Sequence, residues 1–154
     1  MQFSLFIEGG IAMKKVIIVD DEIGFAKDTA RLLQIGNDQL SVSAVSSAEE
    51  AMRQMAEAPA DVIIVDVKLS DMNGLTLMGL IRENWPSTAI IAMTAYGAED
   101  VIKRAFSAGA MFYIEKPFKA ENLGSMIRMV ELKKQSKTSA GKGNVINLRI
   151  PKQP

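Results

Sequence analysis

Two identical apolar runs constrain the fold of this chain more than any other feature. The pentapeptide VIIVD occurs at residues 16–20 and again at residues 62–66. Each run is too short for a helix and rich in β-branched residues, which is typical of a strand buried on both faces. A sheet with such strands needs helices on both sides. The segments that follow the two runs differ, so the match does not indicate an internal repeat.

Strand and helix patterns alternate five times along the chain. Apolar runs predict strands at 16–20, 40–45, 62–66, 88–93 and 110–114, and the segments between and after them predict helices at 22–35, 47–58, 74–84, 98–108 and 119–136. Ser47 followed by Glu50 is a capping box that opens the second helix. We expect Phe25, Leu32 and Leu33 to form the apolar side of the first helix. The alternation predicts an α/β fold, a doubly wound five-stranded parallel sheet flanked by five helices.

The ends of the chain read differently from its middle. We interpret residues 1–12 as an extension outside the fold and residues 13–136 as the folded domain. Residues 137–154 read as a linker-like tail or as the stub of an output segment. No apolar run approaches the roughly 18–20 residues of a membrane span. Residues 1–12 also lack the features of a signal peptide, so we expect a cytoplasmic protein.

Composition narrows the chemistry that the chain can perform. It contains no cysteine and no histidine, and its 18 basic residues balance 18 acidic ones. Thiolate and imidazole chemistry are therefore excluded, and no basic excess points to nucleic acid or an anionic membrane. A bound metal would have to be held by oxygen, which favours Mg²⁺ or Mn²⁺.

Carboxylates end two of the predicted strands. Asp20 and Asp66 end the VIIVD runs, and Asp21 follows the first directly. Ligands of a parallel α/β sheet bind at the carboxyl ends of its strands. Either aspartate alone reads as a turn residue, but three carboxylates at one edge repel one another unless a cation is present. The sequence therefore predicts an Mg²⁺ site at this edge.

Two further strand ends carry polar side chains. Thr94 ends the fourth strand and could donate a hydrogen bond to a phosphoryl oxygen. Lys116 follows the fifth strand, where an ammonium would balance the acids and stabilise a transferring phosphoryl group. Each residue alone reads as a cap or as solvated surface. The bond between Lys116 and Pro117 is of the kind that adopts the cis form in tight turns.

Together these motifs resemble the receiver domain of response regulators, the CheY-like superfamily of two-component signalling. VDDE, VIIVDVKLSDMNGL, MTAYG and YIEKPF occur in the family's order and at its spacing, and the resemblance covers residues 14–135. It implies a flavodoxin-like sheet with the strand order 2-1-3-4-5. It also implies a bacterial signalling switch that catalyses its own phosphorylation and slow dephosphorylation and is not a turnover enzyme.

The resemblance assigns a role to each motif residue at the strand ends. Asp66 resembles the phosphoacceptor, which takes the phosphoryl group from a phosphohistidine on a sensor histidine kinase or a histidine phosphotransfer protein. The metal ligands implied are Asp20, Asp21, Asp66 and the backbone carbonyl of Lys68, with Mg²⁺ as the cofactor. Thr94 resembles the switch hydroxyl.

Two residues on the predicted fifth strand and after it complete the implied mechanism. Lys116 resembles the lysine that pairs with the phosphoryl group, and Tyr113 resembles the switch aromatic that turns inward with Thr94. This repacks the surface of the fourth helix, fifth strand and fifth helix, which would signal to an output domain or protein or support a homodimer. We expect some of the following to be exposed in a partner patch there: Phe106, Met111, Phe112 and Met126.

Four positions depart from the family pattern or vary within it. Ser70 stands where proline is usual, so we expect a more mobile loop after Asp66. Phe112 stands where a small polar residue is common, which predicts a stickier surface. Lys68 and Tyr96 occupy positions that influence how fast the phosphoryl group is lost.

Three other functions compete with a phosphorylated receiver. A hydrolase of the aspartyl-phosphate type would place a second acid two residues after the nucleophile, where this chain has Lys68. A nucleotide-binding module is disfavoured because Asp20 and Asp21 would repel a phosphate. A receiver-like module that binds partners without phosphorylation is the remaining alternative.

Overall fold

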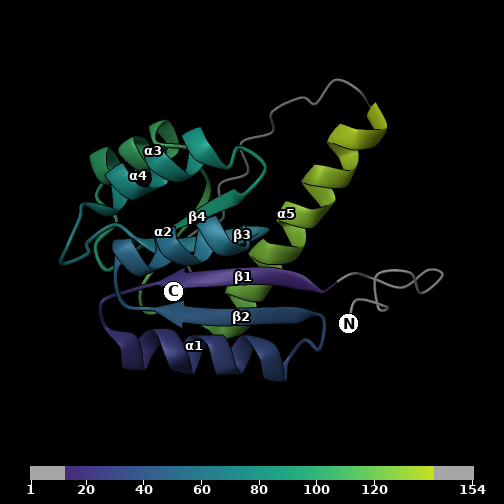
Figure 1. Ribbon diagram of the computed structural model, residues 1–154, viewed down its shortest axis with the longest axis horizontal. Coiled ribbons are helices and arrows are strands. Elements are labelled where there is room, and N and C mark those ends of the chain that lie inside the picture. The colour runs from purple at the N-terminus through teal and green to yellow at the C-terminus, as the bar shows by residue number, and fades with distance from the viewer. Residues whose placement is uncertain (1–12, 141–154) are drawn as a thin grey trace.

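The protein folds as an alternation of five strands and five helices. The structure, a computed structural model, describes residues 13–140, with side chains as far as residue 136. The elements in chain order are β1 (Lys14–Val19), α1 (Ile23–Ile35), β2 (Leu40–Val45), α2 (Ala48–Glu57), β3 (Val62–Asp66), α3 (Gly74–Asn84), β4 (Ala89–Thr94), α4 (Glu99–Ser107), β5 (Ala110–Glu115) and α5 (Ala120–Ala140). The strands form one parallel sheet in the order β2-β1-β3-β4-β5 (Figure 1). The predicted α/β fold and strand order are confirmed.

The two VIIVD copies lie side by side in register. In the β1–β3 pair, Val16 is opposite Val62 and Val19 is opposite Val65. All four are fully buried, because these strands are central in the sheet and have neighbours on both sides. The register brings the aspartates that follow to the same edge.

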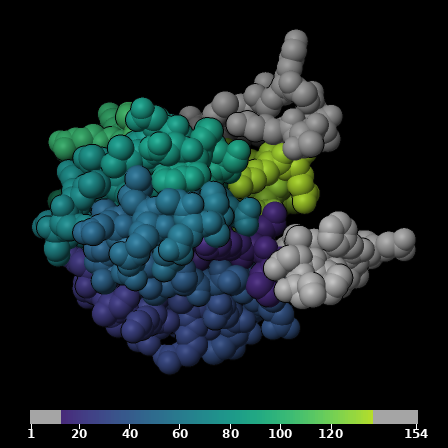
Figure 2. All heavy atoms as spheres, viewed as in Figure 1, coloured from purple at the N-terminus to yellow at the C-terminus, as the bar shows by residue number. Residues whose placement is uncertain are grey.

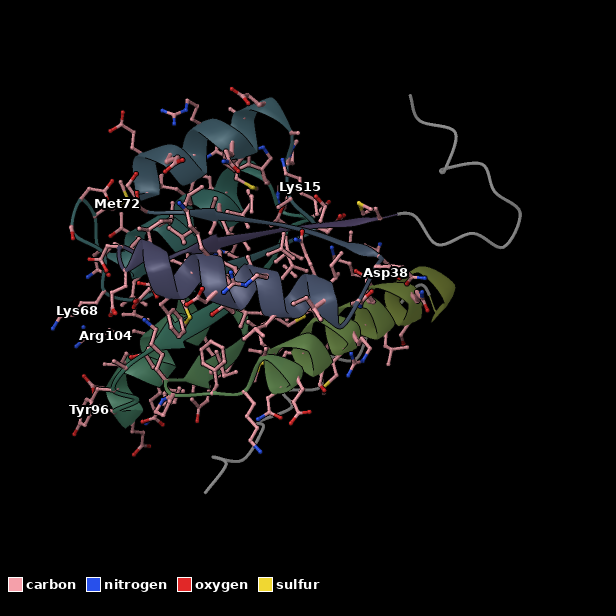
Figure 3. The ribbon with its side chains drawn as sticks, turned by 90° about the horizontal axis from the view of Figure 1, so that it is seen from below. Lys15, Asp38, Lys68, Met72, Tyr96 and Arg104 are labelled. Atoms are coloured by element: carbon pink, nitrogen blue, oxygen red, sulfur yellow. The ribbon has the colours of Figure 1, made fainter. Side chains whose placement is uncertain are left out.

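Helices cover both faces of the sheet, which explains the continuous apolar runs. Along β1, Val16 and Ile18 pack toward α1 and α5, whereas Ile17 and Val19 pack toward α2 and α3. Viewed from below, α1 and α5 lie side by side across one face (Figure 3). Helices α2, α3 and α4 pack in succession over the other (Figure 2). Each strand therefore supplies alternate side chains to two separate cores.

Leu32 and Phe112 are placed differently from the sequence prediction, and Met126 is among the candidates that are buried. Leu32 is 54 % exposed, while the buried stripe of α1 runs through Ala26, Ala30 and Leu33. Leu32 lies about 100° around the helix from Leu33 and so misses the sheet. Phe112 and Met126 are core residues, each at most 2 % exposed, because both point into the α1–α5 layer. Phe112 therefore does not make the surface stickier, and the two do not belong to an exposed partner patch, whereas Phe106 and Met111 are half-buried.

Element ends differ from the predictions by a few residues. β1 ends at Val19, so Asp20 follows the strand, and α5 continues to Ala140 beyond the predicted end at residue 136. No glycine or proline occurs between Gly124 and Gly141, so nothing in the sequence stops the helix earlier. The predicted cap is present, with the Ser47 hydroxyl accepting from the Glu50 N–H at 3.1 Å.

Predictions for residues 1–12 and 141–154 fall outside the described residues. Within the described part of the chain, no helix combines the length and hydropathy needed to cross a membrane.

Candidate functional site

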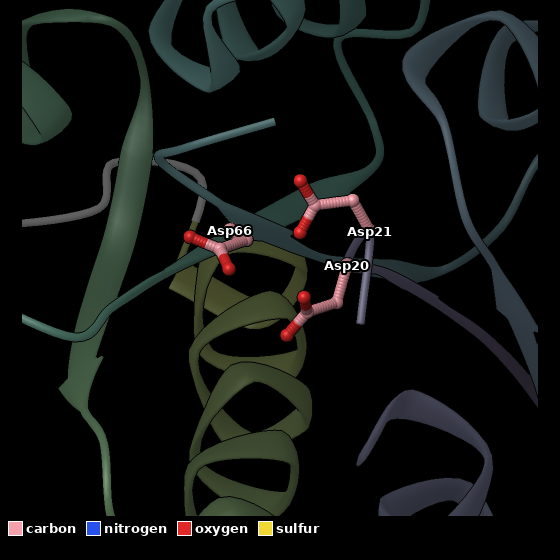
Figure 4. Close-up of side chains that lie close together, drawn as sticks. All are labelled: Asp20, Asp21 and Asp66. Atoms are coloured by element: carbon pink, nitrogen blue, oxygen red, sulfur yellow. The ribbon is translucent and has the colours of Figure 1, made fainter. Parts of the chain in front are cut away.

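Three aspartates meet at the carboxyl edge of the sheet. Asp20 follows β1, Asp21 is next to it, and Asp66 ends β3. One carboxylate oxygen from each lies within 4.8 Å of the others, and the three side chains converge (Figure 4). Asp20 is fully buried, Asp66 is 6 % exposed, and Asp21 is exposed. Three hard oxygen donors in a chain without histidine or cysteine fit Mg²⁺.

Lys116, which follows the edge strand β5, bridges two of these carboxylates. Its ammonium lies 2.6 Å from Asp20 Oδ2 and 2.9 Å from Asp66 Oδ2. The Lys116 backbone N–H donates to the Thr94 carbonyl at 2.8 Å, and the bond to Pro117 is cis. The single positive charge of the ammonium is therefore shared between two of the three carboxylates.

Backbone N–H groups hold the remaining carboxylate oxygens of the buried pair. Asp20 Oδ1 accepts from the Glu22 N–H at 2.9 Å, and Asp66 Oδ1 accepts from the Lys68 N–H at 3.0 Å. Both carboxylates are thus fixed in orientation by the turns that follow their strands.

The surroundings of the cluster shift the pKa values of Asp66 and Lys116. Burial raises the pKa of Asp66 above its ordinary value of 3.8 and Asp20 adds to this, while the Lys68 N–H and Lys116 oppose it. Burial works to lower the pKa of Lys116. Its hydrogen bonds to Asp20 and Asp66 outweigh burial, so the pKa of Lys116 is raised above 10.5. The lysine is therefore fully charged at neutral pH.

Thr94 and Tyr113 lie on the neighbouring strands. The Thr94 hydroxyl donates to the Tyr96 carbonyl at 2.9 Å and accepts from the Tyr96 N–H at 3.1 Å. Tyr96 itself is 76 % exposed. The half-buried Tyr113 ring packs edge-on against Phe106 of α4, with centroids 6.0 Å apart. Strand β5 is thereby connected to α4 through an aromatic contact.

Comparison of the sequence with models of protein families identifies the family of this chain. The model of the response regulator receiver domain matches residues 16–128, which include the three aspartates, Thr94 and Lys116. The chain belongs to the receiver family. Receiver domains bind Mg²⁺ at an acidic cluster, take phosphoryl groups from histidine kinases and regulate output domains as signalling switches.

Curated relatives place this receiver among bacterial response regulators. It is 35 % identical over 113 residues to the response regulator protein FleR of Pseudomonas aeruginosa, covering 73 % of this chain and 24 % of FleR. It is 31 % identical over 116 residues to the sensory transduction protein LytT of Bacillus subtilis, covering 75 % of this chain and 47 % of LytT. The chain thus spans about a quarter to a half of the length of these relatives.

Solved receivers have the same fold. A CheY-like receiver domain protein from Methanospirillum hungatei superposes with a TM-score of 0.75 at 26 % identity, over 82 % of this chain and 99 % of that one. The BeF3-activated receiver domain of DrrB gives a TM-score of 0.71 at 28 % identity, over 78 % and 98 % of the two chains. The resemblance inferred from the motifs is confirmed.

The receiver site contains most of the predicted residues in direct contact. Asp20, Asp66 and Lys116 form one hydrogen-bonded group, and the Lys68 N–H joins it. Asp21 has its carboxylate oxygen within the same cluster. Thr94 adjoins Lys116 through the backbone, whereas Tyr113 lies further back along β5, beside α4.

Sequence reasoning missed two side chains at this site. The Lys116 ammonium lies over the Phe25 ring, 4.6 Å from its centroid, and Phe25 packs edge-on against Phe118. The Ser70 hydroxyl donates to Asp21 Oδ2 at 2.6 Å. The periodicity of α1 identified Phe25 only as an apolar residue, and Ser70 was marked only by the proline it replaces.

Proposed function

We propose that this receiver accepts a phosphoryl group on Asp66 in an Mg²⁺-dependent reaction. The observation that carries the proposal is the cluster of three carboxylates at one edge of the sheet, two of which are bridged by the Lys116 ammonium. The cognate donor would be a phosphohistidine on a sensor histidine kinase or a histidine phosphotransfer protein.

In the proposed reaction a carboxylate oxygen of Asp66 attacks phosphorus in line with the leaving imidazole nitrogen. The new O–P bond forms as the N–P bond breaks, and the bonding electron pair stays on the nitrogen. Lys116, which reaches the Asp66 carboxylate at 2.9 Å, would stabilise the charge on the transferring oxygens. Mg²⁺, when bound, would neutralise the phosphoryl oxygens. Asp20, Asp21, Asp66 and the Lys68 carbonyl are its proposed ligands.

The acyl phosphate would change the surface of α4, β5 and α5. Thr94 would exchange its hydrogen bond with the Tyr96 carbonyl for one with a phosphoryl oxygen, and the Tyr113 ring would leave Phe106 and turn inward. This is a shift between two packings of one fold. A downstream output segment, or a second copy in a homodimer, would read the altered surface.

The test is covalent phosphorylation followed by mass spectrometry. The wild-type chain is incubated with a small-molecule phosphodonor and Mg²⁺, and we expect a gain of one phosphoryl group that is lost again over time. Asp66→Ala should gain none. Asp38→Ala is the matched control, because Asp38 is exposed and lies at the far end of the molecule from Lys68 (Figure 3). It should react like the wild type.

Two outcomes would replace the proposal. No uptake from any phosphodonor would favour a module that binds partners without phosphorylation, and rapid turnover of a free phosphomonoester would favour a hydrolase. In the phosphorylated sample, unchanged Tyr113 ring resonances by NMR would rule out the proposed switch while leaving the transfer step intact.

A further inference from the structure

The loop between β3 and α3, residues 67–73, contacts the acidic cluster through Ser70. The Ser70 hydroxyl donates to Asp21 Oδ2 at 2.6 Å, joining residues 49 positions apart. This is a short hydrogen bond to a charged acceptor, a class that is stronger than neutral pairs.

The three carboxylates differ in how they are held. Asp20 and Asp66 each have both oxygens occupied, one by Lys116 and one by a backbone N–H. Asp21 is exposed, and within residues 13–136 Ser70 is its one hydrogen-bond donor. Among the described residues no donor reaches its other oxygen, Oδ1, while Oδ2 is held by Ser70.

The loop that carries Ser70 is anchored on both sides. Asp71 accepts hydrogen bonds from the Ala48 and Glu49 N–H groups at 3.1 Å each, capping α2 from outside that helix. At the other end Asn73 accepts from the Leu75 N–H at 2.8 Å. The hydroxyl is therefore presented from a backbone that is fixed to α2 and to α3.

We propose that Ser70 is a positioning residue for metal binding, because its hydroxyl fixes the orientation of the Asp21 carboxylate. The inference rests on the proposed Mg²⁺ site. An exposed aspartate that is already oriented has less side-chain freedom to lose when its free oxygen engages a cation. A residue without a side-chain donor at this position could not hold Asp21 in this way, so the restraint depends on the Ser70 hydroxyl.

The test is the Mg²⁺ affinity of the unphosphorylated protein, measured by isothermal titration calorimetry. We expect Ser70→Ala to bind Mg²⁺ roughly three- to tenfold more weakly than the wild type, as the loss of one hydrogen bond to a charged group implies. Ser70→Thr keeps the hydroxyl and should bind within about twofold of the wild type.

A matched control separates the hydroxyl from a general effect of serine removal. Ser125→Ala deletes an exposed hydroxyl that donates to the Glu121 carbonyl in α5, and it should leave Mg²⁺ affinity unchanged. The urea midpoint of Ser70→Ala should also match the wild type, because the lost hydrogen bond is on the surface.

The outcomes distinguish this inference from the proposed function. Unchanged or tighter Mg²⁺ binding by Ser70→Ala, or equally weak binding by Ser70→Thr, would overturn the role of the hydroxyl while leaving the Mg²⁺ site in place. A wild-type protein that takes up no Mg²⁺ would overturn both.

Discussion

Lys116 balances the charge of the acidic cluster. Its ammonium contacts Asp20 and Asp66, and its side chain is 14 % exposed. Asp20 has no exposure at all, so its charge depends on this partner and on the Glu22 N–H. A buried charge that loses its partner is strongly destabilising.

Removal of this ammonium should therefore destabilise the fold in a metal-dependent way. We expect Lys116→Met to lower the free energy of unfolding by about 3 kcal/mol without Mg²⁺, since Asp20 and Asp66 are left facing each other. Added Mg²⁺ should recover part of the loss, because a divalent cation replaces the missing charge. Urea unfolding with and without Mg²⁺ measures both effects.

Lys103→Met serves as the control for this substitution. Lys103 pairs with Glu99 at 3.2 Å on the surface of α4, and both side chains are about three-quarters exposed. Surface pairs of this kind contribute about 0.5 kcal/mol or less, so Lys103→Met should unfold almost like the wild type. A Lys116→Met protein as stable as this control would show that the acids do not rely on Lys116.

At the residue scale the sequence predicted which side chains share the site but not how they touch. Asp66 ends a strand, Asp20 and Lys116 directly follow strands, and the parallel topology brings strand ends to one edge. The contact between Ser70 and Asp21 depends on the path of a loop and on side-chain rotamers, neither of which has a sequence period. That contact could be found only in three dimensions.

At the scale of elements, Gly74 sets the distance between α3 and the end of β3. A Cβ added at Gly74 would lie 2.1 Å from the Asp66 carbonyl oxygen and 2.7 Å from Val67 Cα. Both are backbone atoms, and the Gly74 N–H also donates to the Val67 carbonyl at 2.9 Å. The first turn of α3 thus packs directly on the backbone of the proposed phosphoacceptor.

A methyl group at this position should push helix and strand apart. We expect Gly74→Ala to reduce the free energy of unfolding by about 3 kcal/mol or more, because overpacking against backbone cannot be relieved by a rotamer change. Displacement of Asp66 should also reduce phosphorylation by the small-molecule donor. Urea unfolding and mass spectrometry test the two effects.

Gly79 in the same helix provides a control, because its substitution should change the stability in the opposite direction. Gly79 lies in the middle of α3, and a Cβ there would meet no atom within 4 Å beyond its chain neighbours and the backbone of its own helix. Gly79→Ala should therefore stabilise the protein by up to about 1 kcal/mol through helix propensity. If both variants are destabilised equally, the close packing at Gly74 is not the cause.

The sequence predicted elements well where hydrophobic periodicity defines them. It predicted them poorly where tertiary packing decides which side chains are buried. The strands at 16–20 and 62–66 were evident because burial on both faces requires continuous apolar runs. Leu32 was misplaced because adjacent leucines in α1 gave no sign of which one faces the sheet, and the small residues Ala26 and Ala30 decide it.

At the scale of the whole molecule, the buried carboxylate of the acidic site lowers the stability of the fold. Burial raises the pKa of Asp66, so folding favours its protonated form. The favourable contribution of this carboxyl is complete below its ordinary pKa of 3.8 and is lost as pH rises through the raised value in the folded protein. At neutral pH the ionised, buried carboxylate of Asp66 therefore lowers the stability of the fold.

Asp66→Asn should remove this destabilisation, and its effect on the free energy of unfolding should depend on pH and on Mg²⁺. We expect the variant to be more stable than the wild type at pH 7 without Mg²⁺, by on the order of 1 kcal/mol, the size usual for removing a destabilising functional group. The single amide oxygen can still accept from the Lys68 N–H, and Lys116 keeps its contact with Asp20. As the pH falls below 3.8 the two proteins should converge, because the wild-type carboxyl is then protonated as well. Mg²⁺ should stabilise the wild type far more than the variant, because only the wild type keeps the carboxylate that would bind the ion in the folded state.

Urea unfolding across this pH range, with and without Mg²⁺, measures each difference. A variant that is less stable than the wild type at pH 7 without metal would mean that Lys116 and the Lys68 N–H already outweigh the burial of Asp66.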